Sequence, residues 1–239
     1  MDVTSHEETA ETSATGRSGK AKRKPLPLWQ ETILLVVVAL VLALIVKTFL
    51  VQAFWIPSGS MEDTLQVDDR ILVQKVSYWA GEPQRGDVVV FDDPGDWLGV
   101  GYEEEVGPVQ QVLSVFGLFP TGGHLVKRVI GVGGDRVVCC DADGRLQING
   151  VSIDEPYVPD PAATADARFD VVVPEGRLWL MGDNRGNSTD SRAHQGGPGG
   201  GFVRTDAVLG KAWVVVWPLK RAGTAGSDHE PFADVPDPD

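Results

Sequence analysis

Cysteine and histidine are both scarce in this 239-residue sequence. The two cysteines, Cys139 and Cys140, are adjacent, and of the four histidines His6 and His229 lie near the ends of the chain. Two neighbouring thiols cannot build a disulfide scaffold or a cysteine-rich zinc site. We expect them to be structural or free, because adjacent cysteines seldom meet disulfide geometry. Stability must therefore come from the burial of apolar side chains.

Basic residues are in deficit, since 21 Lys and Arg face 34 Asp and Glu, for a net charge of −13. Residues 1–24 hold five basic and four acidic groups, so the remaining chain carries −14. An acidic body has no electrostatic means of holding phosphates, which excludes nucleic acid as a partner. Hydrophobic residues make up 42% of the chain and the mean hydropathy is −0.07. These values exclude a wholly disordered chain and a polytopic membrane protein.

There is one long apolar run, Ile33–Val46, and its apolar character resumes through Trp55. We predict a disordered cytoplasmic tail over 1–28 and a transmembrane anchor over 29–55, with the basic residues before the run keeping the N-terminus in the cytoplasm. The rest of the chain would then be extracytoplasmic. Two alternatives remain open. The run is also compatible with a cleavable secretory signal ending near Val51-Gln52-Ala53, or with a buried helix of a soluble domain.

The body of the chain is strand-like. Short runs rich in β-branched and aromatic residues are separated by Gly, Pro, Asp and Asn, at 71–76, 87–91, 125–132, 135–140, 145–150, 168–174, 177–182 and 211–219. This pattern predicts a mostly β, antiparallel sheet or barrel-like domain over 56–220.

Two stretches depart from the strand pattern. Residues 92–122 form an insertion in which Val109, Val112, Leu113 and Phe116 have helical spacing. They predict a short amphipathic helix, packed on the β core or dipping into a membrane. Residues 221–239 are acidic, and we predict a disordered tail there.

A serine-rich turn, Ile56–Met61, follows the apolar run directly. It holds two hydroxyls, Ser58 and Ser60, around a glycine that permits close approach of the backbone to a substrate. A serine nucleophile needs a base within hydrogen-bonding reach. His124 and His194 are candidates, and Lys127 is another, because burial within its apolar strand would lower the pKa of its amine.

A third polar cluster spans Met181–Arg192. Its Asp183, Asn187 and Asp190 resemble calcium ligands, but the run lacks a closing glutamate and includes arginines. A hydrogen-bonded network that braces a site fits these residues better.

Taken in order, these segments resemble the motif boxes of bacterial type I signal peptidases, which are serine endopeptidases with a Ser/Lys dyad. The preceding apolar segment matches the membrane anchor of that family, and a weaker echo lies at 210–213 and 217–218. The four matching segments are Ile56–Met61, Arg85–Phe91, Val126–Gly131 with Gly134-Asp135, and Gly182–Arg192.

The resemblance implies a role for each matching residue. Ser60 would be the nucleophile and Lys127 the general base, while the Ser58 hydroxyl and the Ser60 backbone N–H would form the oxyanion hole. Ser188 would orient the lysine, and Asp190 and Arg192 would brace the site. The implied walls of the substrate pocket are Phe54, Ile56, Pro57, Met61, Leu65, Leu125 and Val126.

The resemblance also implies the substrate and the location. An enzyme of this family cleaves exported preproteins after a small-x-small motif such as Ala-x-Ala, on the outer face of the cytoplasmic membrane, in contact with the lipid bilayer and the export machinery, without a metal or cofactor. Gly133 and Gly186 depart from the family pattern, which commonly has Pro and Asp there. Two other functions remain open: a Ser/Lys peptidase of another specificity, such as self-cleavage, and an inactive membrane-tethered β-domain that binds partners.

Overall fold

The structure, a computed structural model, describes residues 27–79, 81–95, 97–98, 123–164 and 167–238. The chain divides into two units, Met1–Leu40 and Val41–Asp239, and each is considered by itself. The predicted helix at 108–119 lies outside the described residues, as does most of the 92–122 insertion.

The apolar run forms helix α1, Leu28–Ile45. Its leucine and valine side chains are largely exposed, as Leu40 shows with 65% of its surface accessible. Within the residues that the structure describes, no helix is both long and apolar enough to cross a membrane.

The C-terminal part of the predicted 29–55 anchor was wrong. Residues Val46–Leu50 form a short π-helical segment, η1, and Val51–Trp55 form strand β1, which pairs with β2. The β-branched and aromatic side chains of Val51–Trp55 suit a strand as well as a membrane interface, and the alternating burial of Phe54 and Trp55 is that of a sheet edge.

The second unit contains the following strands: β1, β2 (Arg70–Gln74), β3 (Val88–Asp92), β4 (His124–Gly131), β5 (Arg136–Cys139), β6 (Leu146–Ile148), β7 (Val151–Ser152), β8 (Phe169–Val172), β9 (Arg177–Met181), β10 (Val203–Arg204), β11 (Val208–Trp217) and β12 (Gly223–Thr224). Short 3₁₀ helices connect them: η2 (Gly59–Met61), η3 (Val76–Tyr78), η4 (Pro161–Thr164), η5 (Arg185–Asn187), η6 (Thr205–Ala207), η7 (Leu219–Arg221) and η8 (Glu230–Phe232).

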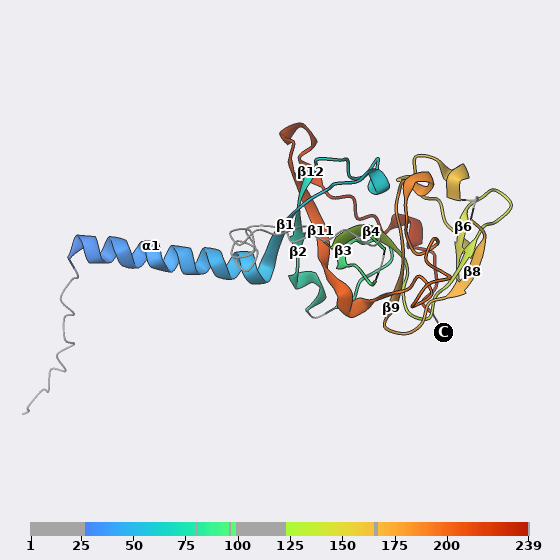
Figure 1. Cartoon of the computed structure of the whole chain (residues 1–239), viewed down its shortest axis with the longest axis horizontal. Helices are drawn as coiled ribbons and strands as arrows, with labels where there is room; N and C mark the ends of the chain where they lie inside the picture. The colour runs from blue at the N-terminus through green and yellow to red at the C-terminus, as the bar shows by residue number, and fades with distance from the viewer. Residues whose placement is uncertain (1–26, 80, 96, 99–122, 165–166, 239) are drawn as a thin grey trace, which may run out of the picture. The chain divides into compact units, whose positions relative to one another are not determined.

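The described strands form two antiparallel sheets (Figure 1). The larger runs β1-β2-β11-β3-β4-β9-β10, with β12 beside β11, and the smaller runs β7-β6-β5-β8. Each of the eight predicted strand-like runs overlaps an observed strand, so the prediction of a mostly β, antiparallel domain is confirmed.

Three apolar clusters hold the sheets together. The first, around Trp179, combines side chains of the smaller sheet with side chains of β4 and β9. The second lies around Leu65 and Ile71, and the third lies around Phe91 and Leu180. The second and third occupy opposite faces of the larger sheet, because neighbouring residues of β3 such as Val88 and Val89 alternate between them.

The prediction of a disordered tail over 221–239 was wrong. Phe232 and Val235 are buried in the cluster around Trp179, and β12 pairs with β11. The Arg85 guanidinium donates hydrogen bonds to the carbonyls of Val235 and Pro236, at 3.3 and 3.1 Å. The acidic composition of this segment predicts disorder, but its two apolar side chains are part of the core. Its backbone is also held by Arg85, which comes from a loop distant in the sequence.

Strand β4 has one partly open edge. Its residues His124–Arg128 pair with β3 on one side, whereas β9 joins the other side only from Arg128 onward. Among the described strands, none pairs with that second edge over His124–Lys127. A row of backbone groups next to Lys127 is therefore available for an extended peptide.

Candidate active site

Two side chains distant in sequence meet at the end of this open edge. Ser60 lies in the tight turn η2, which follows β1, and Lys127 lies in β4. Lys127 Nζ is 2.6 Å from Ser60 Oγ and forms a hydrogen bond with it. Both residues are buried, with 9% and 3% of their surfaces accessible. A hydroxyl and an amine in this arrangement can exchange a proton.

Burial changes the protonation of Lys127. Removal of the ammonium from water is the largest effect on its pKa, and Arg192 acts in the same direction, whereas the nearby carboxylates Asp190 and Asp183 favour the charged form. The net result is a pKa lowered from 10.5 to about 8. A substantial fraction of the amine is therefore neutral near physiological pH and can accept a proton.

Neither candidate histidine contacts the serine. Within the described residues, Ser60 Oγ has Lys127 Nζ and, at 3.5 Å, Ser58 Oγ as its hydrogen-bond partners. His124 Nδ1 lies 2.9 Å from Asp92 Oδ1, and His194 is stacked on Trp97. Of these three candidate groups, the Lys127 amine is the one that lies within hydrogen-bonding distance of Ser60 Oγ.

The backbone at Gly182 lies against the nucleophile turn. A Cβ at this position would lie well under 3.0 Å from the Ser188 hydroxyl and from the Ser60 carbonyl oxygen. The Gly182 N–H donates to Asp190 Oδ2 at 3.0 Å. Only glycine permits this approach, which brings the 181–192 segment next to Ser60.

The Ser188 hydroxyl is buried, and it lies close enough to the Asp190 carboxylate to help lower the pKa of that group. Asp190 and Arg192 form an ion pair with two contacts of 2.9 Å. Burial alone would raise the pKa of Asp190, but Arg192 and the Gly182 N–H outweigh it and lower that pKa. The carboxylate is therefore charged, and Arg192 neutralises it.

Sequence reasoning assigned no role to a second buried ion pair. Arg128 donates to both oxygens of Asp183, at 2.8 and 2.7 Å, and its guanidinium lies 3.6 Å from the centre of the Tyr157 ring. Thr64 donates to the same aspartate. One feature of the sequence could have indicated this ion pair. Lys127 and Arg128 are consecutive residues of β4, so one cation lies on each face of the sheet and each needs a partner there.

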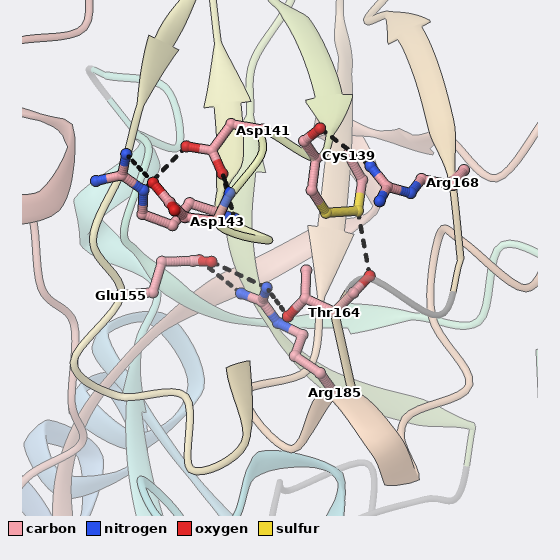
Figure 2. The surroundings of a disulfide bond; sticks show 9 residues. Cys139, Asp141, Asp143, Glu155, Thr164, Arg168 and Arg185 are labelled. Atoms are coloured by element: carbon pink, nitrogen blue, oxygen red, sulfur yellow. Dashed lines mark hydrogen bonds and ion pairs between the residues drawn. A yellow bond between two sulfur atoms is a disulfide. The ribbon is translucent and has the colours of Figure 1, made fainter. Parts of the chain in front are cut away.

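Arg185 was also missed. Its buried side chain forms two hydrogen bonds with Glu155, at 3.0 and 2.6 Å, and donates to Thr164 Oγ1 at 3.2 Å, as Figure 2 shows. Its Nε donates to the Gly182 carbonyl at 2.9 Å. This arginine connects the loop after β7 and the helix η4 to the segment beside Ser60.

Cys139 and Cys140 form a disulfide with each other. The expectation from the sequence, that adjacent cysteines seldom meet disulfide geometry, was wrong for this pair. Arg168 donates to the Cys140 carbonyl at 3.1 Å, and Cys139 Sγ lies 3.2 Å from the Thr164 carbonyl oxygen (Figure 2). The pair belongs to β5 and the residue after it, within the smaller sheet.

Most of the predicted pocket residues gather on one face of the larger sheet. Leu125 instead packs with Val89 in the cluster around Phe91, and Pro57 is exposed. The five residues that share the cluster around Leu65 are Phe54, Ile56, Met61, Leu65 itself and Val126.

The chain was compared with protein families, with curated proteins and with solved structures. The profile of the family described as "Signal peptidase, peptidase S26" matches residues 29–217. The chain is 41% identical to a "Probable signal peptidase I" of Mycobacterium leprae, over 92% of this chain and 86% of that protein. It is 42% identical to a "Signal peptidase I" of Mycobacterium tuberculosis, over 87% and 78%. A crystal structure of a signal peptidase I from Enterococcus faecalis matches 55% of this chain and 97% of its own, at 27% identity and a TM-score of 0.34.

The contact at Gly182 predicts a specific sensitivity. Gly182→Ala should lower the free energy of unfolding by about 1–3 kcal/mol, because the new methyl group must displace the Ser60 backbone or the Ser188 hydroxyl. Urea denaturation measures this. Gly186→Ala is the matched control, since its Cβ would make an ordinary 3.4 Å contact with Ala163, and it should change stability by less than ~0.5 kcal/mol. Equal effects of the two substitutions would contradict the close approach.

Proposed function

Because the chain belongs to the signal peptidase family, peptidase S26, we propose that this serine peptidase removes signal peptides with Ser60 as nucleophile and Lys127 as general base. One observation carries the proposal: a buried amine with a lowered pKa lies 2.6 Å from a buried serine hydroxyl. In water a lysine is protonated at neutral pH and cannot act as a base. Here its surroundings remove that obstacle.

The proposed reaction proceeds through an acyl-enzyme. Neutral Lys127 accepts the Ser60 proton as Oγ attacks the scissile carbonyl carbon. The ammonium then gives this proton to the leaving amine of the mature protein, and the C–N bond breaks. In the second half, Lys127 takes a proton from water, which attacks the ester, and the proton returns to Ser60 Oγ as the signal peptide leaves.

The negative charge that develops on the substrate oxygen requires donors. We assign this role to the Ser60 backbone N–H and the Ser58 hydroxyl, which is exposed and lies on the same turn. Donors fixed before reaction stabilise the transition state without reorganisation, and loss of one typically costs about 100–1000-fold in kcat.

An extended substrate fits the open edge of β4. Its backbone would pair with His124–Lys127, which brings the scissile bond to Ser60 at the end of that edge. The apolar side chains of Phe54, Ile56 and Val126 would form shallow pockets beside this edge. Large substrate side chains would clash there, which supports a small-x-small cleavage motif.

Three neighbouring residues would hold the lysine in place. The Ser188 hydroxyl is buried beside Gly182 and retains the capacity to accept a hydrogen bond from the lysine amine. Asp190 and Arg192, paired with each other, would fix the backbone that carries Ser188.

Cleavage assays test the two catalytic assignments directly. With a preprotein that carries an Ala-x-Ala site, Ser60→Ala and Lys127→Ala should each lose at least ~1000-fold in kcat/KM, because each removes a group that takes part in bond formation. The detergent-solubilised full chain and the exposed-lysine control Lys220→Ala should cleave equally well, with folding checked by circular dichroism.

Three other outcomes of this assay would each contradict a different part of the proposal. Activity that survives in Lys127→Ala would overturn the base. An inactive wild type whose Ser60 reacts with a serine-directed probe would indicate a peptidase of other specificity. An inactive wild type with an unreactive Ser60 would favour a binding domain.

The pH dependence should follow the Lys127 amine. Since burial lowers its pKa to about 8, the neutral, active form predominates above that pH. kcat/KM should therefore fall about tenfold per pH unit below ~8 and level off above it. A midpoint near 6.5 that disappears in His124→Ala or His194→Ala would instead assign the base to a histidine.

We also propose that the apolar segment that begins with α1 and continues through η1, and so is longer than α1 alone, inserts into the cytoplasmic membrane. The basic tail would then lie inside and the catalytic unit outside, where the export machinery releases preproteins. Support comes from the exposed apolar side chains of α1 and from the basic residues between Arg17 and Lys24. The chain should stay with the membrane in alkaline carbonate, and protease added to spheroplasts should digest its C-terminal body. Release by carbonate, or protection of the body, would contradict the proposed topology.

A further inference from the structure

Asn184 makes three hydrogen bonds to the turn that carries Ser60. Its backbone N–H donates to the Ser60 carbonyl at 3.1 Å. Its side-chain Nδ2 donates to the Gly59 carbonyl at 3.1 Å and to Glu62 Oε2 at 3.3 Å. Both hydrogens of the amide nitrogen are thus used, and a single residue holds two consecutive carbonyl groups of the turn.

The Gly59 carbonyl is the important acceptor, because it shares a peptide plane with the Ser60 N–H. In a planar trans peptide these two groups point in opposite directions. The Gly59 oxygen also accepts a hydrogen bond from the Glu62 N–H at 3.2 Å. With two donors holding the oxygen on one side, the Ser60 N–H is aimed to the other side.

Glu62 limits the movement of the Asn184 amide. Its carboxylate oxygens lie about 3 Å from the point where a Cβ on residue 59 would stand, so this carboxylate covers Gly59 directly. Two residues therefore enclose the turn: Glu62, which directly follows it in the sequence, and Asn184, which lies in the segment after β9. A rotation of the Gly59–Ser60 peptide would break both bonds to the Gly59 oxygen.

We propose that Asn184 is a positioning residue that orients the Ser60 N–H toward the substrate oxyanion. The inference rests on the proposed function, in which that N–H is one of two oxyanion donors. Without the Asn184 side chain the Gly59 carbonyl keeps one of its two bonds, and the peptide plane gains freedom to rotate. The N–H then has to be reoriented during the reaction, so kcat falls while binding of the ground-state substrate is retained.

The test compares Asn184→Ala and Asn184→Asp, which lacks the donor, with Asn187→Ala. Asn187 is an exposed asparagine three residues away in η5, and its backbone N–H bonds to the Asn184 carbonyl. Both Asn184 variants should lose about 10–100-fold in kcat with KM within about twofold, and Asn187→Ala should match wild type. The midpoint of the pH profile of Asn184→Ala should not move, because this substitution adds no charge near Lys127.

Two ligands separate positioning from a general loss of structure. A substrate-derived peptide aldehyde, which forms a tetrahedral adduct with Ser60, should bind more weakly by the same factor as the fall in kcat/KM. The corresponding peptide alcohol, which forms no adduct, should bind within about twofold of wild type. Equal weakening of both ligands, a shifted pH midpoint in Asn184→Ala, or an equal loss in Asn187→Ala would overturn the proposal.

The outcome for the wild type keeps the two proposals apart. If wild type neither cleaves an Ala-x-Ala preprotein nor binds the aldehyde, the proposed function fails and the inference falls with it. If wild type does both and the Asn184 variants are unaffected, only the assignment of Asn184 is wrong.

Discussion

The rest of the site depends on the burial of one amine. Lys127 lies within an apolar strand, where a charged ammonium is costly, and its hydrogen bond to Ser60 is useful only because the charge is easily lost. An unopposed carboxylate beside it would favour the charged ammonium, which could not serve as the base that we propose. The two nearest carboxylates, Asp183 and Asp190, are each paired with an arginine, Arg128 and Arg192. Each pair limits the field that its aspartate exerts on the amine.

The same requirement accounts for the surrounding polar network. Arg128, Arg185 and Arg192 are buried or nearly so, and each binds a carboxylate as well as a backbone carbonyl near the site. Buried charges are tolerated when they are paired and hydrogen-bonded. Through these contacts the 181–192 segment, which lies against the nucleophile turn, is joined to Glu155 and to the turn at Gly86.

The sequence predicts much of this because the relevant signals are local. β-Branched runs mark the strands, and the Ile56–Met61 and Gly182–Arg192 segments are dense in the residue types that a serine peptidase needs. The pairing of Arg128 with Asp183 and the bonds of Asn184 join residues far apart in the chain. The hydrophobic periodicity of the sequence carries no information on such long-range contacts, so only the folded structure reveals them.

The two wrong predictions, for Val51–Trp55 and for residues 221–239, have a common origin. Both rested on the average composition of a segment, whereas the tertiary contacts of a few side chains determine its conformation. Val51–Trp55 is as apolar as a membrane segment, yet it pairs with β2. Residues 221–239 are as acidic as a disordered tail, yet Phe232 and Val235 complete a core. In both segments a tertiary partner, absent from the local sequence, determines the conformation.

The burial of Phe232 and Val235 also has a consequence for the order of events during synthesis. These side chains pack in the same cluster as Val137 and Trp179, which precede them by dozens of residues. The cluster cannot close until almost the whole chain has left the ribosome. A nascent or truncated chain that ends before these residues therefore leaves the side chains around Trp179 partly uncovered, although it already contains Ser60 and Lys127.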